Sequence, residues 1–292
     1  MAEAETRTGQ APAAGAGGTL PERVRFRNVS RVFGTGPAAR VAIQDVSFVV
    51  YDQPATGELV TLVGPSGCGK STVLRIIAGL RPHFPPTQGE ALVFGKPIAG
   101  PSADRGIVDQ KYSLLPHLTV LENVAFGLKL KGVGRAERLG LAREWVAKVG
   151  LDGAETKYPA ELSGGMQQRV AIAATLILKP KILLMDEPFG ALDPKIRLRM
   201  QELLIELWKE QKATVFFVTH AVEEAVYLGD RVFRMGSKPG RLVEVLQLPR
   251  PNEPPETMRT KPWFREVTQE LLRRLEEDAP AAGELKSFTR AN

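Results

Sequence analysis

The chain has 292 residues, enough for one large domain or two small ones around a well-buried core. Hydrophobic residues make up 43% of it and charged residues 25%, a composition that excludes a fibre or a fully disordered chain. The formal net charge of +6 fits an anionic ligand, a nucleic acid or a membrane surface and does not choose among them. The single cysteine excludes an internal disulfide and favours a reducing, cytoplasmic compartment.

The two ends of the chain differ from its middle. Residues 1–21 hold few large apolar side chains, so we expect a disordered tail without a signal peptide. No apolar run approaches the roughly 18 residues of a membrane span, so a membrane role should come through a partner. Residues 241–292 are expected to form an extension with a proline-rich linker and one amphipathic helix over 263–277. For that helix, packing back on the domain is favoured over a regulatory module.

A glycine-rich stretch between two apolar segments carries the strongest chemical signal. Residues 59–63 are typical of a buried strand and 72–77 of a buried helix, which is the context that a phosphate loop requires. In such a loop backbone N–H groups surround the anion, the lysine reaches the outer phosphates and the final hydroxyl is a Mg²⁺ ligand. A chance match is the alternative, because glycine-rich turns are common. The residues expected to hold nucleotide here are Gly64, Pro65, Ser66, Gly67, Cys68, Gly69, Lys70, Ser71 and Thr72. For Cys68 a small packing side chain is favoured over a redox role.

Strands and helices alternate along much of the chain. Two alternating segments, 24–33 and 41–50, precede the phosphate loop and predict a β-rich edge. Residues 111–162 predict an inserted helical subdomain, and the runs at 182–185 and 214–219 are typical of parallel strands covered on both faces. We therefore predict an α/β fold, a P-loop NTPase core with an antiparallel β edge and a helical insertion.

An acidic pair follows the apolar run that ends at Met185. An acidic residue at the carboxyl end of a strand beside a phosphate loop is where Mg²⁺ takes a carboxylate, so Asp186 joins Ser71 as a candidate metal ligand. Glu187 is placed to activate the attacking water, a role that contributes ~10²–10⁴-fold to rate. Alone, such a pair is more often a solvated loop. Together with the phosphate loop, it indicates a catalytic site.

Leu162 to Arg169 forms a second pattern suited to an anion. Ser163 is a natural N-cap, and the two glycines after it expose backbone N–H groups at the positive end of the predicted helix. A capped ordinary helix is the alternative interpretation. One nucleotide site does not need two distant helix starts of this kind, so the pattern needs a further explanation.

Together these motifs resemble the ATP-binding-cassette (ABC) ATPases over about residues 22–240. The loop at 64–71 is similar to the Walker A motif of that family, 182–187 to Walker B, and 162–167 to the signature motif. The resemblance implies an ABC ATPase fold, ATP and Mg²⁺ as cofactors, and ATP hydrolysis as the activity. It also implies a homodimer in which the signature serine and glycines of each copy close on the γ-phosphate of the other copy.

The resemblance assigns roles to single residues. Gln110 matches the glutamine that senses Mg²⁺, and Asp193 lies in the loop that joins the two sites across the dimer. His220 matches the switch histidine that contacts the γ-phosphate, and Phe33 falls where an aromatic ring stacks on adenine. Each residue also has a plainer interpretation: a polar loop histidine, a glutamine without a signal of its own, a core phenylalanine. The implied catalytic residues are Glu187, His220 and Gln110; the implied metal ligands are Ser71, Gln110 and Asp186; and nucleotide contacts beyond the phosphate loop are Phe33, Ser163, Gly164, Gly165, Gln167 and Asp193.

Within the family, residues 82–110 and 187–193 resemble importers of nitrate, sulfonate, taurine and related anions. This implies a motor at the cytoplasmic face of the inner or plasma membrane that drives uptake through a separate permease, with an external solute-binding protein upstream. The helical block with Leu114–Leu118 would dock the permease, and the transported substrate would not touch this chain. Asp109 departs from the aromatic residue usual before the glutamine, which puts a charge near the Mg²⁺ site or at a subunit contact.

Two alternatives belong to other functional classes. The first is a soluble ABC ATPase that acts on nucleic acid or ribosomes; such proteins usually carry two cassettes or a long coiled-coil insertion, so we expect no nucleic-acid partner. The second is a binding module that does not hydrolyse ATP. The presence of Lys70, Asp186, Glu187 and His220 argues against it.

Overall fold

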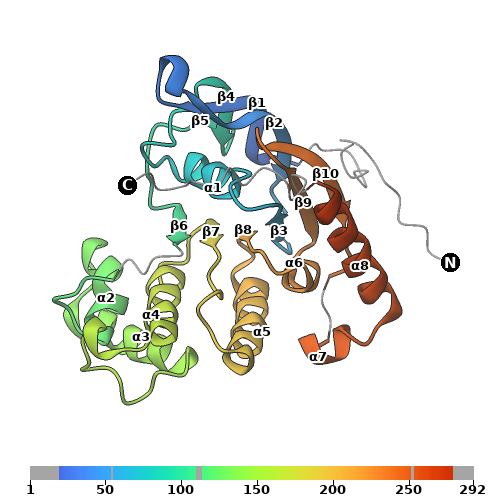
Figure 1. The fold of residues 1–292 in the computed structure, drawn as a ribbon. Helices are drawn as coiled ribbons and strands as arrows, with labels where there is room; N and C mark the ends of the chain where they lie inside the picture. Colours follow the sequence, from blue (N-terminus) through green and yellow to red (C-terminus); the bar gives the residue numbers. More distant parts are fainter. Residues whose placement is uncertain (1–19, 54, 110–113, 251–252, 279–292) are drawn as a thin grey trace, which may run out of the picture.

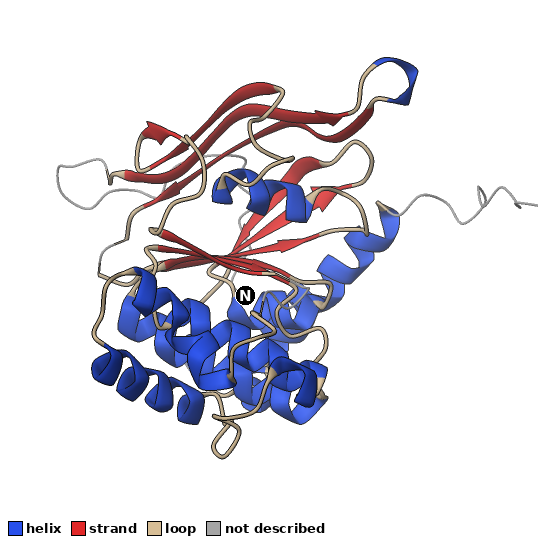
Figure 2. Cartoon of the chain, turned by 90° about the vertical axis from the view of Figure 1, so that its left-hand side faces the viewer, coloured by secondary structure: helices blue, strands red, loops and turns tan. Residues whose placement is uncertain are grey.

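The computed structural model describes residues 20–53, 55–109, 114–250 and 253–278. These residues form layers: a small antiparallel sheet, one helix beneath it, a larger sheet, and a layer of helices on the far side (Figures 1 and 2). Two hydrophobic clusters result, one between the sheets around the enclosed helix and one between the larger sheet and the outer helices.

The small sheet is the predicted antiparallel edge. Its strands lie in the order β2-β1-β4-β5. The long strands β1 (Glu22–Phe33) and β2 (Arg40–Tyr51) pair antiparallel, and alternate residues of both are buried, which explains the alternation seen in the sequence. They are joined through the short helix η1 (Gly36–Ala38), and the sheet is completed by β4 (Gln88–Val93) and β5 (Lys96–Pro97).

The larger sheet has the order β10-β9-β3-β8-β7-β6. The first five strands from the β6 edge are parallel, and β10 pairs antiparallel with β9. Every residue of β3, β7 and β8 is buried, which explains their continuous apolar runs. The strands are β3 (Glu58–Val63), β6 (Arg105–Val108), β7 (Ile182–Asp186), β8 (Thr214–Val218), β9 (Arg231–Gly236) and β10 (Arg241–Gln247).

The helices fall into two groups. Helix α1 directly follows the phosphate loop and lies between the two sheets (Figure 2), whereas the others cover the opposite face of the larger sheet or lie beside it. Helices α2 and α3 pack against each other and against α4. The elements are α1 (Lys70–Ala78), α2 (Val120–Leu130), α3 (Arg135–Lys148), η2 (Pro159–Glu161), α4 (Gly164–Leu176), α5 (Pro194–Gln211), α6 (Val222–Leu228), α7 (Pro255–Met258) and α8 (Pro262–Glu277).

The sheet continues past residue 240, where the sequence placed the start of an extension. Strand β10 forms one edge of the larger sheet, and the turn before it brings Gly240 against the phosphate loop. Helix α7 occupies part of the expected linker, and α8 packs back on α6 with Phe264 and Leu271 buried. In the described part of the chain, no helix combines the length and apolar character needed to cross a membrane.

Candidate nucleotide site

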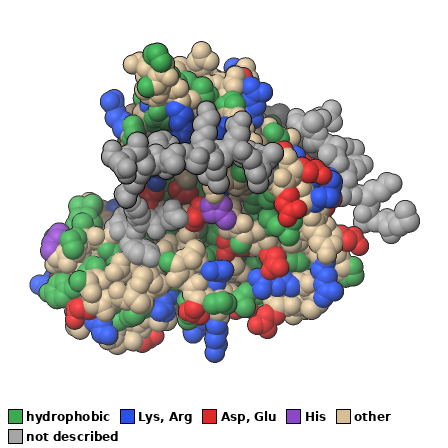
Figure 3. All heavy atoms as spheres, in the orientation of Figure 1, with side chains coloured by type: hydrophobic (Ala, Val, Ile, Leu, Met, Phe, Trp, Pro, Cys, Tyr) green, Lys and Arg blue, Asp and Glu red, His purple; other side chains and the backbone are tan. Residues whose placement is uncertain are grey.

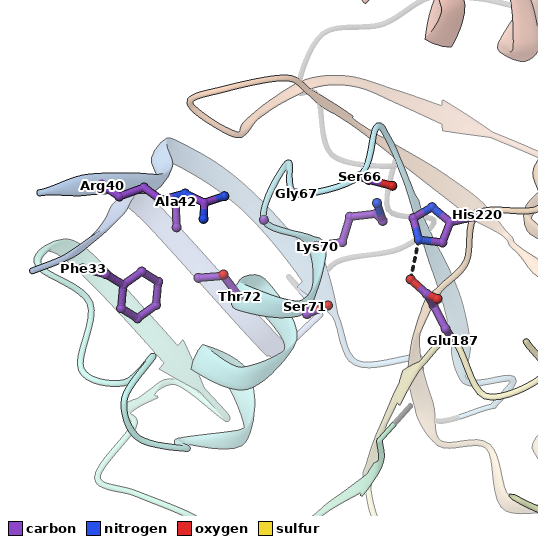
Figure 4. Close-up of a pocket in the computed structure, with 11 residues that line it drawn as sticks. Phe33, Arg40, Ala42, Ser66, Gly67, Lys70, Ser71, Thr72, Glu187 and His220 are labelled. Atoms are coloured by element: carbon purple, nitrogen blue, oxygen red, sulfur yellow. Dashed lines mark ion pairs between the residues drawn. The ribbon is translucent and has the colours of Figure 1, made fainter. Parts of the chain in front are cut away.

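A pocket of about 400 Å³ opens beside the start of α1. Figure 4 shows Phe33 and Arg40 at one end of it, Glu187 and His220 at the other, and the phosphate loop between them. The pocket is therefore elongated, with an aromatic end and a charged end. Its lining residues are Phe33, Arg40, Ala42, Ser66, Gly67, Gly69, Lys70, Ser71, Thr72, Glu187 and His220.

The phosphate loop is a tightly folded turn at the positive end of α1. Gly69 caps the helix with φ +93°, and a Cβ at this position would lie 2.3 Å from Cγ2 of Ile43, so only glycine fits. The Lys70 side chain is 5% exposed, and its Nζ donates hydrogen bonds to the carbonyl oxygens of Gly64 (2.8 Å) and Pro65 (3.1 Å). The loop thus presents backbone N–H groups and an ammonium group, a setting suited to phosphate.

The remaining loop residues support this shape from inside. Cys68 is almost completely buried, and burial raises the pKa of its thiol, which fits a small packing side chain and not a redox group. Its carbonyl oxygen contacts the β9–β10 turn, since a Cβ on Gly240 would lie 1.8 Å from it. Gly240 also donates to the carbonyl of Ala42 (3.2 Å) and accepts from the N–H of Gln44 (2.8 Å).

The aromatic end of the pocket is built from β1 and β2. The Phe33 ring is partly exposed on the pocket wall, 5.1 Å from the His83 ring edge-on and 5.0 Å from the Arg31 guanidinium. Phe33 therefore lines the pocket and is not a core residue, while its stacking on adenine stays a prediction. Arg40 and Ala42 also line this end. Sequence reasoning missed them, because a single arginine at the start of a strand gives no signal.

A serine and an aspartate from different elements meet below the phosphate loop. Ser71 Oγ donates to Asp186 Oδ1 at 2.9 Å, and Asp186 lies at the carboxyl end of β7. Burial raises the pKa of the Asp186 carboxyl group, which the Ser71 hydrogen bond and the Arg75 charge partly oppose. A buried carboxylate beside a hydroxyl offers the oxygen ligands that Mg²⁺ prefers, so these residues fit the metal.

The unusual Asp109 has a partner in this same region. Its Oδ1 lies 3.4 Å from Nη2 of Arg75, and the same nitrogen lies 3.9 Å from Oδ2 of Asp186. The charge of Asp109 is therefore matched by a guanidinium that also faces the candidate metal ligand. Gln110, expected next to it as a catalytic residue and metal ligand, lies outside the described residues.

Glu187 and His220 form the charged end of the pocket. Glu187 Oε1 lies 2.5 Å from His220 Nε2, a contact shown by the dashed line in Figure 4. The Glu187 backbone has φ +51°, which is unfavourable for a residue other than glycine, and its N–H donates to the carbonyl of Val218 (3.0 Å). The fold therefore holds Glu187 in a strained backbone conformation at this end of the pocket, with its carboxylate against the His220 ring.

The signature residues and Asp193 do not line this pocket. Ser163 caps α4 and accepts a hydrogen bond from the N–H of Met166 (3.3 Å), as the sequence predicted for an N-cap. Gln167 donates to the carbonyl of Pro159 (2.9 Å), and Asp193 caps α5 through the N–H of Ile196 (3.0 Å). Within one chain, the N-terminus of α4 therefore lies apart from the phosphate pocket at the N-terminus of α1.

A phosphate loop between a parallel strand and a helix, with a Ser–Asp pair below it, defines a P-loop nucleotide-binding protein. The sequence model of the ABC transporter family matches residues 43–190. The chain is 46% identical to an ABC transporter ATP-binding protein of Methanocaldococcus jannaschii, over 88% of this chain and 92% of that protein. It therefore belongs to the ABC transporter family, as an ATP-binding protein with the ABC ATPase fold.

Named relatives and solved structures agree with this assignment. An aliphatic sulfonates import ATP-binding protein of Bacillus cereus is 42% identical over 87% of this chain and 96% of its own length. A nitrate import ATP-binding protein of Synechocystis is 44% identical over 85% and 93%. A dimeric ATP-binding cassette solved in a post-hydrolysis state with ADP and Pi is similar with a TM-score of 0.69 and 34% identity, over 77% of this chain and 99% of that one. The chain is accordingly an ATP hydrolase, and the alternative of a module that only binds ATP is set aside.

Proposed function

We propose that this ATP hydrolase drives an importer for a small anion or organosulfonate, of the nitrate, sulfonate and taurine class. The Glu187–His220 pair at the end of the phosphate-loop pocket is the observation that carries the catalytic part of the proposal. The relatives named for sulfonate and nitrate import support the substrate class. Because those relatives carry transport names, they give no support to the alternative of an ATPase that acts on nucleic acid.

The elongated pocket suggests how ATP lies in it. Phe33 would stack on adenine at one end, and the backbone N–H groups of the loop with Lys70 would hold the phosphates. Glu187 would then take a proton from the attacking water. The Glu187 carboxylate, in contact with His220, would also orient the histidine ring toward the γ-phosphate. Ser71 and Asp186 would hold Mg²⁺, with Gln110 as a further ligand, and the metal would neutralise developing charge on the phosphates.

The separate signature helix supports a site completed by a second copy. Ser163, Gly164, Gly165 and Gln167 lie at the start of α4, away from the pocket of their own chain. Helix N-termini bind phosphate, so this one would cover the γ-phosphate held by the other copy, with Asp193 in the loop between the two sites. The dimeric cassette with ADP and Pi supports such a homodimer.

Removing the Ser71 hydroxyl should weaken the binding of Mg²⁺ at the site. We expect Ser71→Ala to raise the Mg²⁺ concentration for half-maximal hydrolysis roughly tenfold, because one of the proposed oxygen ligands is lost and Asp186 is left without its hydrogen-bond donor. A Mg²⁺ titration of the hydrolysis rate measures this. Ser102→Ala, in an exposed turn, is the control, and an unchanged Mg²⁺ midpoint for Ser71→Ala would contradict the metal assignment.

A second hollow, of about 340 Å³, offers a place for the permease. It lies between β6, α2 and α4 and is mostly apolar, and Leu130 at its rim is 73% exposed. Figure 3 shows hydrophobic side chains gathered over α2 on this side of the molecule. An apolar groove of this kind suits a short amphipathic helix from a membrane-embedded partner. The groove residues used here are Leu114, Leu115, Phe126, Leu130 and Leu178.

A substitution in this groove tests whether the chain binds a membrane permease, which would place it at the cytoplasmic face of the membrane. We expect Leu130→Glu to abolish co-purification of the chain with its permease, because a carboxylate would have to be buried in the apolar contact. Hydrolysis by the isolated chain should persist, since Leu130 is outside the nucleotide pocket. Leu272→Glu, at an exposed leucine of α8, is the matched control. Retained permease with Leu130→Glu, or recovery of nucleic acid instead, would overturn the proposal.

A further inference from the structure

Three buried polar side chains from three different elements meet behind the pocket. Gln201 of α5, Glu224 of α6 and Thr219, which directly follows β8, are 1%, 5% and 4% exposed. Gln201 Nε2 donates to Glu224 Oε1 at 2.8 Å, and Thr219 Oγ1 donates to Glu224 Oε2 at 2.5 Å. Both carboxylate oxygens thus accept a hydrogen bond from a different part of the fold.

The same threonine fixes the backbone on both sides of His220. Thr219 Oγ1 accepts from the N–H of Ala221 (3.0 Å), and the Thr219 N–H donates to the carbonyl of Leu62 in β3 (3.3 Å). We call Thr219–Ala221 the switch segment. The first and last residues of this segment are therefore tied to each other, and Glu224 accepts a hydrogen bond from the first of them.

The chemistry of Glu224 indicates more than packing. Burial raises the pKa of this carboxyl group, whereas the two hydrogen bonds and the charges of Arg197 and Arg259 oppose the rise. A buried carboxyl group is costly, and an apolar residue of similar size would fill the space with less expense of free energy. A hydrogen-bonded group at this place fixes geometry, which an apolar side chain would not do.

Gln201 connects this arrangement to the start of α5, the helix that Asp193 caps. Gln201 and Asp193 are eight positions apart, a rise of roughly 12 Å at 1.5 Å per residue. Arg197, between them, donates to the carbonyls of Phe189 (3.3 Å) and Leu192 (3.0 Å), so the first turns of α5 are also fixed to the segment after Glu187.

From these contacts we propose that Glu224 is a positioning residue, which sets the His220 ring against Glu187 and ties the switch segment to α5. The inference rests on the proposed catalytic role of His220 for its effect on hydrolysis. Its structural part, the placement of the ring, stands on the hydrogen bonds themselves. The two parts can therefore be tested separately.

The placement of the ring can be measured by NMR. The chain has three histidines, so the ¹H–¹⁵N signals of the His220 imidazole can be assigned, with His83 and His117 as internal references. Glu224→Gln is expected to shift the His220 signals, because a neutral amide cannot accept from both donors in the same way. Its neighbour Glu223→Gln, on the exposed side of α6, should leave them in place. Unchanged His220 signals in Glu224→Gln would overturn the proposal.

Hydrolysis supplies the second measurement. We expect Glu224→Gln to lower kcat about tenfold with the KM for ATP nearly unchanged, because the side chain touches no part of the nucleotide pocket. Thr219→Val should share the defect and Thr219→Ser should restore the rate, since serine keeps the hydroxyl. An equal loss in Thr219→Ser and Thr219→Val would contradict a role for that hydroxyl. If His220→Ala hydrolyses at the full rate, the proposed role of His220 fails, while the NMR result still decides the placement.

Discussion

Glu187→Gln is expected to reduce ATP hydrolysis by at least about 100-fold, within the ~10²–10⁴-fold range of a general base. The amide keeps the size of the side chain but cannot take a proton from water. Lys70 and the loop backbone are unaltered, so nucleotide should still bind. An ATP-bound dimer should therefore accumulate.

Phosphate release and size-exclusion chromatography with ATP and Mg²⁺ measure the two effects. Glu266→Gln, at an exposed glutamate of α8, is the control and should hydrolyse and elute like the unmodified chain. Hydrolysis at the original rate by Glu187→Gln would exclude the base assignment. Loss of hydrolysis without an ATP-dependent dimer would contradict the shared site.

Lys70→Ala should weaken ATP binding by roughly 10–100-fold, which corresponds to the ~1.5–3 kcal/mol of a hydrogen bond to a charged group. Two causes act together: the ammonium group that would meet the phosphates is lost, and the carbonyls of Gly64 and Pro65 lose a donor that holds the loop in shape. Calorimetric titration with ATP gives the affinity.

Lys70→Met also removes the ammonium group but keeps most of the side-chain length. A similar loss of ATP affinity in both variants would therefore come from the missing ammonium group and not from altered packing. Circular dichroism checks that both variants are folded, and Lys96→Ala, at an exposed lysine of β5, is the charge-matched control. Normal ATP affinity in Lys70→Ala would contradict the phosphate cradle.

The sequence was sufficient for the fold class and for the family because the signals lie in continuous stretches. The phosphate loop, the buried run before Asp186 and the N-cap at Ser163 are each encoded by neighbouring residues, and the local structure follows from them. The predicted strands over 24–33 and 41–50 are confirmed as β1 and β2, because a strand with one buried face alternates apolar and polar residues in the sequence.

The contacts that the sequence did not reveal join distant residues. Arg40 lines the pocket from the start of a strand. Asp109 contacts Arg75, which is 34 positions away in the sequence, and Gln201 contacts Glu224, which is 23 positions away. None of these contacts produces a pattern among neighbouring residues of the sequence. Strand β10 was missed for another reason: as an edge strand it has no fully buried residue, so its alternation is weak.

The close approach of Gly240 to Cys68 bears on how short a fragment of this chain can be and still form the nucleotide site. The turn that carries Gly240 is held in register by β10, whose partner β9 lies directly beside the strand that leads into the phosphate loop. A fragment that stops at residue 240 would contain every catalytic motif and yet lack the strand that supports the back of the loop. We therefore expect the minimal ATP-binding unit to end at Gln247 or later.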